Sequence, residues 1–427
     1  MSGRYKAVPT GTIANGKPVI VNSTGTVSQV AESSSVVGSA VTYENAHARS
    51  FTISSAFDSN SNKVVIAYRD NDNSGYGTAV VGTVDSSDNS ISFGTAVVFN
   101  SGALRDYVNT AMVFDSSNNK IVIAYADNSD SDKGKAIVGT VSGTSISFGS
   151  EAEFESGSTT AISATFDSSN NKVVIAYQDA DNSKYGTAVV GTVSSTSISF
   201  GTPVTFDTSG TTDHIESTFD SNSNKVVIAY RDRSNSNYGT AIVGTVSSTS
   251  ISFGTAVVFE STHSYNFGPV FDSSNNKVVI SYSDYGTGNP ISGNVVVGTV
   301  SGTSISFGSV VIWKSSAHSS DNKTVFDSSV NKVVIAHLVS NQGTFSIGTV
   351  SGTSISFGTD FTYTTISSGG STPVFDSNSN RVVVPFSDGG AGVGNLGKAV
   401  VAQIGSSNMT SEGYIGLSNA CSFHGAT

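Results

Sequence analysis

The sequence predicts an all-β protein built from repeats, and three observations support this class. The tripeptide Phe-Asp-Ser recurs seven times along the 427 residues, at steps of 49 to 57 residues. Each copy leads into an Asn- and Ser-rich turn and then a run of apolar, β-branched residues. The element Ser-Ile-Ser-Phe-Gly occurs six times, once in every repeat except the last. A self-similar period of this length, made of strand-like segments, is typical of repeat architectures.

The third repeat shows the expected order of four strands, named A to D along the chain. Strand A runs over 161–166 and ends at Asp-Ser-Ser-Asn-Asn, a tight turn in which Asn tolerates left-handed backbone and Asp and Ser bond nearby amides. Strand B, 172–177, is continuously apolar, as expected for a strand buried on both faces. Strand C covers 186–193. Strand D, 198–206, begins with the alternating pattern of a strand that has one solvated face.

The two ends of the repeat region complete each other. The last repeat stops after its third strand, 398–404, and residues 38–44 resemble a fourth strand such as 254–260. Seven four-stranded repeats that exchange a strand between their ends predict a seven-bladed β-propeller over 34–404, closed by an N-terminal strand that completes the last blade. An open solenoid or a row of small sandwiches has no use for such an exchange.

Two segments lie outside the repeats. Residues 1–33 are expected to form a small β extension with short strands at 16–22 and 25–30. Residues 405–427 form a tail in which 414–417 is the apolar patch. Because an isolated hairpin is marginal in water, we expect these segments to pair with each other or with a neighbouring subunit. They are therefore predicted to dock the protein to its own copies or to other assembly proteins, the alternative being that both ends fray.

The charge balance excludes some classes of partner. The net charge is −11 with 21 Lys and Arg, whereas nucleic-acid binding needs a basic surface that displaces phosphate counterions. An acidic chain is also not expected at anionic membranes, and no run approaches the ~20 apolar residues that span a bilayer. A single cysteine, Cys421, allows no internal disulfide. The first residues lack the apolar core of a secretory signal, so export is expected to occur by lysis or a specialised route.

Comparison of the repeats separates two faces of the predicted propeller. The A–B and C–D turns are nearly constant, whereas the D–A and B–C connections vary in length and chemistry. Variable loops on a rigid scaffold commonly carry recognition, so we predict a polar and aromatic ligand-binding surface there; the alternative is a set of solvated loops. The candidate ligand-binding residues are His47, Arg105, Tyr107, His214, Arg231, His263, Tyr265 and His318.

An acidic residue opens the B–C connection in six of the seven repeats. A feature repeated around a ring is not expected to be one catalytic centre, so these carboxylates are predicted to accept loop amides and close the turn. The first copy, 70–75, also matches the opening of an oxygen-ligand calcium loop, although the closing Glu is absent. No cofactor is therefore predicted, and calcium at Asp70, Asp72 and Ser74 is the alternative.

The inner strands carry almost no charge, which bears on catalysis. Propeller glycosidases need two carboxylates at a defined separation, and Glu216 is the clear acidic exception in the predicted A strands. No Ser/His/Asp set is recognisable by spacing. The sequence therefore predicts a non-enzymatic protein. The alternatives are a carbohydrate-active enzyme centred on Glu216 and a structural subunit of a shell, tail or filament.

The repeat, written Phe-Asp-Ser-Ser-Asn-Asn-Lys-Val-Val-Ile-Ala-Tyr, then Tyr-Gly-Thr-Ala-Val-Val-Gly-Thr-Val-Ser and Thr-Ser-Ile-Ser-Phe-Gly-Thr, resembles repeats in predicted virion and tail-associated proteins of marine tailed bacteriophages. Residues 11–19 and 413–418 look like the segments that flank such repeats, so the resemblance covers nearly the whole chain. It implies a virion or extracellular setting. There the variable loops would contact a cell-surface receptor or glycan, and the terminal segments would attach the protein to the virion.

Overall fold

The structure, a computed structural model, describes residues 8–9, 19–21, 26–29, 34–48, 52–286, 291–315, 320–389 and 395–405. The chain divides into two compact units, one of residues 1–35 with 404–427 and one of residues 36–403. In the first unit, β1 (Val8–Pro9), β3 (Thr26–Gln29) and β2 (Val19–Val21) form a three-stranded sheet in that order. The predicted tail lies outside the described residues except for Gly405. Among those residues, no helix is long and apolar enough to cross a membrane.

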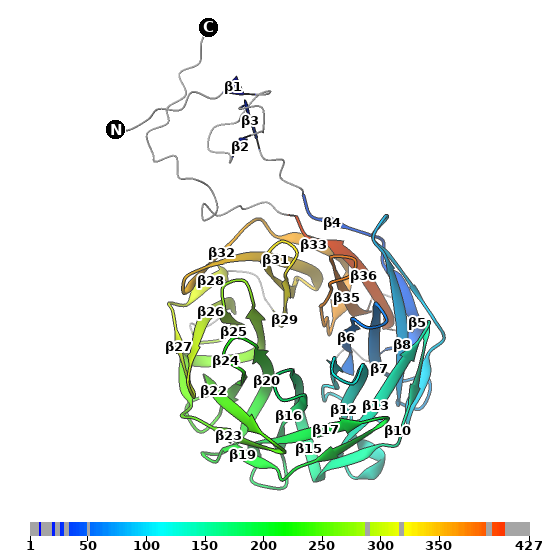
Figure 1. Ribbon diagram of the computed structural model, residues 1–427. Helices are drawn as coiled ribbons and strands as arrows, with labels where there is room; N and C mark the ends of the chain where they lie inside the picture. The colour runs from blue at the N-terminus through cyan, green and yellow to red at the C-terminus, as the bar shows by residue number, and fades with distance from the viewer. Residues whose placement is uncertain are drawn as a thin grey trace. The chain divides into compact units, whose positions relative to one another are not determined.

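The larger unit is a β-propeller, as predicted, and its described strands arrange around a central axis (Figure 1). The four-strand pattern is an antiparallel meander from the axis outward. The A strands are β6 (Ser54–Asp58), β11 (Ala111–Asp115), β15 (Ala152–Asp167), β20 (Thr212–Asp220), β24 (Val257–Asp272), β29 (Ser320–Asp327) and β34 (Val374–Asp376). The B strands are β7 (Lys63–Asp70), β12 (Lys120–Asp127), β16 (Lys172–Asp179), β21 (Lys225–Asp232), β25 (Lys277–Asp284), β30 (Lys332–Val339) and β35 (Arg381–Asp388).

The C strands and the two-piece D strands complete each repeat. The C strands are β8 (Tyr76–Asp85), β13 (Lys133–Ser142), β17 (Tyr185–Ser194), β22 (Tyr238–Ser247), β26 (Ser292–Ser301), β31 (Gln342–Ser351) and β36 (Leu396–Gln403). The D pieces are β9 (Ser90–Phe93), β10 (Val97–Ala103), β14 (Ser145–Phe148), β18 (Ser197–Phe200), β19 (Val204–Asp207), β23 (Ser250–Phe253), β27 (Ser304–Phe307), β28 (Val311–Lys314), β32 (Ser354–Phe357) and β33 (Phe361–Gly369). A short 3-10 helix, η2 (Asn128–Asp130), follows β12.

The predicted exchange of a terminal strand is confirmed. β5 (Val41–His47) pairs antiparallel with β36, and the short β4 (Val36–Val37) pairs with the other end of the same strand. The N-terminal segment therefore supplies the strand that the last repeat lacks. The predicted turn chemistry also holds, since Asp167 Oδ1 accepts bonds of 2.9 and 3.0 Å from the amides of Ser169 and Asn170, and Asn171 has φ +55°.

Neighbouring repeats are held together by an aromatic contact that recurs around the ring. An aromatic ring on each D strand packs on a ring of the next B strand, with centroids 4.5 to 6.0 Å apart. The pairs are Tyr43–Tyr68, Phe99–Tyr125, Phe154–Tyr177, Phe206–Tyr230, Phe259–Tyr282, Trp313–His337 and Tyr363–Phe386. Such pairs contribute about 0.5–1.5 kcal/mol each beyond area burial. The pair Tyr43–Tyr68 shows that the N-terminal strand also completes this set of contacts.

The continuous D strands predicted from the sequence are broken into two pieces, for a steric reason. The glycine of Ser-Ile-Ser-Phe-Gly lies against the C–D turn of the next repeat. A Cβ on Gly201 would lie 1.8 Å from the carbonyl oxygen of Thr249, and Gly38 stands in the same relation to Asn89. Only glycine permits this approach, so the strand pairing stops there and resumes three residues later as β19.

Several D–A connections predicted as loops are strands. β15 and β24 each run without interruption from the D position of one repeat into the A position of the next. A β-bulge marks the crossing in the third, fourth and fifth repeats. The bulge residues Ala161, His214 and Asn266 have φ of +48°, +49° and +54°. Bulges re-aim side chains and are common beside active sites.

Candidate functional site

A pocket of about 760 Å³ opens at the propeller axis, on the side of the D–A and B–C connections. Its wall is built from the A strands of the first six repeats and from residues 370–373 just before the A strand of the seventh, with additions from the D–A connections, the bulges and the B–C turns. This volume lies within the usual range for small-molecule sites. The pocket therefore lies on the face that the sequence predicted to carry ligand recognition.

The pocket contains a ring of equivalent positions, one from each repeat. In each case the residue pairs with the same position of its B strand, so the repeats can be compared atom for atom. The seven residues are Ser54, Ala111, Ser163, Glu216, Gly268, Lys323 and Thr372. Five are small and uncharged, and the two charged ones are opposite in sign. Because five repeats form the same structure with an uncharged residue at this position, the fold does not require a charge here. The two charged residues therefore indicate a specialised role.

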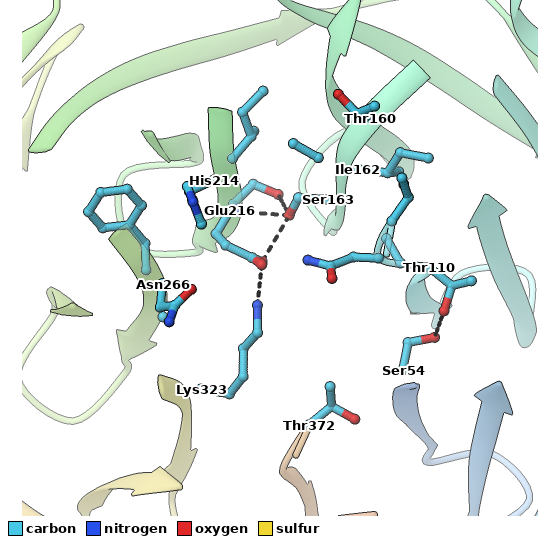
Figure 2. Close-up of a pocket in the computed structure, with 18 of the residues that line it drawn as sticks. Ser54, Thr110, Thr160, Ile162, Ser163, His214, Glu216, Asn266, Lys323 and Thr372 are labelled. Carbon is cyan, nitrogen blue, oxygen red and sulfur yellow. Dashed lines mark hydrogen bonds and ion pairs between the residues drawn. The ribbon is translucent and has the colours of Figure 1, made fainter. Parts of the chain in front are cut away.

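Glu216 and Lys323 form an ion pair across this ring, as Figure 2 shows. Glu216 belongs to the fourth repeat and Lys323 to the sixth, so the pair passes the fifth repeat, whose ring residue is Gly268. The side chains are 20% and 28% exposed, so both ends of the pair are open to the pocket. Ser163 Oγ lies 3.5 Å from Glu216 Oε2 and accepts a 2.9 Å bond from the amide of Ser217. The carboxylate is therefore held in place while remaining accessible.

Gly268 is required where it lies. A Cβ built there would be 2.7 Å from Thr324 Oγ1 and 2.8 Å from Ser281 Oγ, two hydroxyls that bond each other at 2.6 Å. Thr324 follows Lys323 in the same strand. A larger residue at Gly268 would therefore displace the strand that carries the lysine.

His214 projects into the pocket beside Glu216 from the bulge of the fourth repeat (Figure 2). Burial lowers the pKa of His214 to about 4, and the positive charges of Arg231 and Lys323 act in the same direction, against the charge of Asp213. The imidazole is therefore neutral at pH 7 and can both donate and accept a hydrogen bond.

Asp213, the residue before His214, lies in a network of arginines. Arg231 Nη2 donates to Asp213 Oδ2 at 2.7 Å, and Arg233 Nε forms an ion pair with the same oxygen at 2.7 Å. Burial opposes ionisation of Asp213, but the bonds from Arg231 and the nearby positive charges outweigh it and hold the pKa of Asp213 below its usual value. Arg231 Nη1 also lies 2.9 Å from His263 Nε2. Asp213 is therefore a fixed anion with its oxygens occupied.

The predicted ligand-binding residues fall into three groups. Arg105, Tyr107 and His214 line the axial pocket, where Arg105 bonds Ser158 Oγ at 2.8 Å and Tyr107 is 67% exposed. Arg231, His263 and Tyr265 gather beside it around Asp213 and His214. The remaining two are not placed: the side chain of His47 and the whole of His318 lie outside the described part of the chain.

Five of the six acidic residues that open the B–C connections accept loop amides, as predicted, whereas the sixth, Asp388, pairs with Lys398 and is followed by residues 390–394 outside the described part of the chain. Asp70 Oδ1 accepts the amide of Asn73 at 3.1 Å, and Asp127, Asp179, Asp232 and Asp284 accept loop amides in the same way. Among the described residues, no group of three or more His, Cys, Asp or Glu is placed to hold a metal ion. Calcium at Asp70, Asp72 and Ser74 stays a prediction that these contacts do not test.

Sequence reasoning missed part of the site. It left out Lys323, Gly268, Asp213 and Arg233, and it treated Glu216 as isolated. A signal was present, because aligning the repeats at their Phe-Asp-Ser marks places Glu216 and Lys323 three residues before the Phe in each case. Nothing in the sequence indicated that the two side chains meet across the fifth repeat.

Comparisons with known proteins identify the fold. No family model matches the sequence, and no curated protein matches it. The structure is similar to a periplasmic gluconolactonase from Pseudomonas aeruginosa (TM-score 0.51, 10% identity, 72% of this chain and 84% of that one). It is also similar to the polysaccharide lyase Uly1 (TM-score 0.51, 7% identity, 84% and 90%) and to a protein from Lactobacillus plantarum (TM-score 0.50, 12% identity, 74% and 89%). At these identities the likeness establishes the propeller fold.

These comparisons contradict the prediction of a non-enzymatic protein. Structures of the same fold include a lactonase and a lyase, so the fold gives no ground for excluding catalysis. The second ground for that prediction was that Glu216 stands alone, and this is also wrong, because Glu216 is paired with Lys323 inside a pocket. The comparisons carry no information on a phage or virion setting, which stays a prediction.

Proposed function

We propose that the protein is a carbohydrate-active enzyme whose axial pocket binds an acidic saccharide and whose Glu216 takes a proton from it. The observation that carries the proposal is the Glu216–Lys323 pair, the charged exception in a ring of small uncharged residues at the base of a 760 Å³ pocket. The Glu216 carboxylate is paired with Lys323 and open to the pocket, so it can act as a general base. The adjacent ammonium can stabilise negative charge that develops on the substrate.

The arrangement favours chemistry with one base over hydrolysis by two carboxylates. Two-carboxylate glycosidases need one carboxyl group that stays protonated. Here Asp213 is held ionised by two arginines, and Glu216 is held by Lys323. Asp213, whose pKa lies below its usual value, therefore cannot supply the protonated acid that such a mechanism needs.

Eliminative cleavage of a uronate-containing chain fits this arrangement. Glu216 would remove the proton from the carbon next to the sugar carboxylate, while Lys323 neutralises that carboxylate. The electron pair forms a carbon–carbon double bond and the bond to the leaving sugar oxygen breaks. Protonated Glu216 can then return its proton to that oxygen, which balances the reaction. No co-reactant is needed.

The charge of the pocket supports an acidic substrate. The lining has Arg105, Lys184, Arg233 and Lys323 against Asp106, Asp213 and Glu216, although the whole chain carries −11. Clefts whose charge differs from that of their surroundings concentrate ligands of the opposite sign. Two of the similar structures are enzymes named for a sugar lactone and for polysaccharide cleavage, and both kinds of substrate are carbohydrates.

The test is a substrate panel with one substitution and one matched control. The purified chain would be incubated with uronate-containing polysaccharides and with sugar lactones, following the ultraviolet absorbance of the unsaturated product and acid release respectively. We expect elimination that falls at least a hundredfold in Glu216→Gln, because general base catalysis contributes about that much or more. Glu155→Gln removes a carboxylate that bonds Tyr177 outside the pocket and should leave the rate unchanged.

Lactone hydrolysis that depends on Glu216 would support Glu216 as the general base but would show that the reaction is hydrolysis rather than elimination. No turnover and no binding of any acidic saccharide, or full activity in Glu216→Gln, would contradict the proposal. The predicted virion setting rests on the resemblance of the repeats, and the predicted docking through the terminal segments rests on the marginal stability of an isolated hairpin. Detection of the protein in purified phage particles, before and after removal of residues 406–427, would test both.

A further inference from the structure

An aromatic cluster lies next to the axial pocket, on the fourth and fifth repeats. The ring centroids of Tyr265 and Tyr285 are 4.9 Å apart, and His263 stacks on Tyr285 at 5.5 Å with an interplanar angle of 28°. Tyr285 is 45% exposed and is among the few large apolar side chains of the described residues that face solvent. The cluster therefore presents an exposed aromatic side chain beside the site.

The cluster is continuous with the pocket. Tyr265 contacts His214 edge-to-face at 5.9 Å, and His214 lines the pocket beside Glu216 (Figure 2). Asp213, which also lines the pocket, bonds Arg231, and Arg231 contacts His263. A ligand that occupies the axial pocket and extends past His214 toward the fifth repeat would meet Tyr265 and then Tyr285.

The hydrogen-bonding state of His263 is fixed by its neighbour. A guanidinium can only donate, so Nε2 of His263 must accept from Arg231 Nη1 and the ring proton of the neutral form lies on Nδ1. Burial and the charge of Arg231 lower the pKa of His263. A neutral imidazole with one outward donor, stacked on a tyrosine, offers both an apolar face and a polar edge. Sugar rings have the same two kinds of surface.

Arg231, Arg233 and Asp213 form a charged group beside the cluster, and the carboxylate of Asp284, next to Tyr285, adds a negative charge near His263. Asp213 is shared by Arg231 and Arg233, which leaves one positive charge uncompensated within this group. The side chain of Arg233 is 52% exposed, whereas that of Arg231 is 9% exposed. Arg233 can therefore offer its planar N–H groups to a carboxylate on a ligand.

Packing of the loops does not explain these residues. Three repeats make the same backbone bond at this place: the amides of Ala180, Arg233 and Tyr285 donate to the carbonyls of Ser158, Thr211 and His263, at 2.8 to 3.1 Å. Alanine satisfies that geometry in the third repeat. The large side chains of the fourth and fifth repeats are therefore additions to a turn that is stable without them.

We infer that Tyr285, Tyr265 and His263 form an outer sugar-binding subsite, with Arg233 as its carboxylate contact, for the neighbouring unit of an acidic oligosaccharide held in the axial pocket. The inference rests on the proposed function for the identity of the ligand. It adds that the substrate is a chain of at least two units and that affinity depends on its length.

The experiment measures binding of oligogalacturonates of one to five units, and the matching oligomannuronates, to the Glu216→Gln protein, in which turnover does not interfere. We expect affinity to rise with length, and Tyr285→Ala in that background to lower the affinity for long ligands roughly fivefold to tenfold while leaving the single unit unchanged. Tyr285→Phe keeps the ring and should bind as the parent does. Arg233→Gln should lower affinity and reduce its dependence on salt.

The outcomes separate this inference from the proposed function. If binding increases with ligand length and requires Tyr285, but the protein turns over none of the polysaccharides and lactones tested, the subsite is supported and the catalytic role of Glu216 is contradicted. Turnover that requires Glu216, with no effect of Tyr285→Ala at any length, would overturn the subsite and leave the proposed function standing. Equal losses in Tyr285→Ala and Tyr285→Phe would also overturn it, because stacking needs only the ring. Absence of binding by every uronide tested would overturn it as well.

Discussion

The third and fourth repeats have nearly the same backbone and different chemistry. Both carry a bulge at the same place, with Ala161 at φ +48° and His214 at φ +49°. In the third repeat Thr160 faces Gln178, joined by a 2.7 Å bond between Thr160 Oγ1 and Gln178 Oε1. In the fourth, Asp213 faces Arg231, joined by an ion pair.

This difference shows where the chain has departed from its repeat. The ring position changes from Ser163 to Glu216 over the same step, while the buried strands β16 and β21 differ at just one of their eight residues, Gln178 against Arg231. The third repeat folds with the uncharged Thr160–Gln178 pair, so the backbone does not require a charged pair at this place. The Asp213–Arg231 pair of the fourth repeat is therefore expected to serve a function other than folding. The third repeat therefore serves as an internal control for the fourth.

The largest expected effect comes from converting the cross-strand pair in two steps. Asp213→Thr installs the third-repeat residue but leaves Arg231 buried without its carboxylate, and should lower the free energy of unfolding by roughly 2–4 kcal/mol. Adding Arg231→Gln recreates the third-repeat pair and should recover more than half of that loss. Urea denaturation of the two single variants and the double variant gives the coupling. Additive losses would mean that the pair does not interact as the structure describes.

The propeller architecture could be predicted from the sequence because the patterns that specify its strands and turns are local and recur in each repeat. The Phe-Asp-Ser motif predicts a turn, and the apolar B segments and the segment at 38–44 each predict a strand. The structure confirms the last of these, since β5 pairs with β36. The breaks in the D strands were not predictable in this way. They arise from Gly201 and its equivalents meeting a carbonyl of the next repeat, a contact between segments about 50 residues apart.

The site was predicted only as a set of loop residues, for the same physical reason. His214 and Arg231 were identified because they lie in or beside connections that vary between the repeats, where recognition is common. The Glu216–Lys323 contact joins residues 107 apart across an intervening repeat, and no local pattern specifies it. The prediction of a non-enzymatic protein was wrong for this reason. It considered the carboxylates of the inner strands without their spatial neighbours, and so it missed that Lys323 contacts Glu216.

A second expected effect concerns Gly268, the ring residue between the two charged repeats. Gly268→Ala places a methyl group 2.7 Å from Thr324 Oγ1, and overpacking of this kind costs about 1–3 kcal/mol. The strand that carries Lys323 would have to shift, so turnover should fall together with stability. Normal stability and activity in Gly268→Ala would mean that the close packing around the pair is unimportant.

The smallest expected effect is on the pH dependence of stability, and it again uses the third repeat as the reference. The pKa of His214 is about 4 in the folded protein against 6.5 for an unperturbed histidine. Between these values the unfolded chain binds a proton that the folded chain does not, so the free energy of unfolding falls as the pH drops from about 6.5 toward 4. The side chain is partly exposed, so we expect a contribution of about 1–2 kcal/mol rather than the full shift.

His214→Ala installs the third-repeat residue at a backbone position that already accepts alanine, and should make stability less dependent on pH in this window. The slope should not vanish, because burial lowers the pKa of His337 to about 4 as well. Asp213 titrates below its usual range, so its contribution is lost at lower pH and does not confuse the comparison. Chemical denaturation at several pH values between 7 and 4.5 provides the measurement. An unchanged slope in His214→Ala would show that the imidazole is solvated and protonates normally, and that the pocket is wetter than the structure indicates.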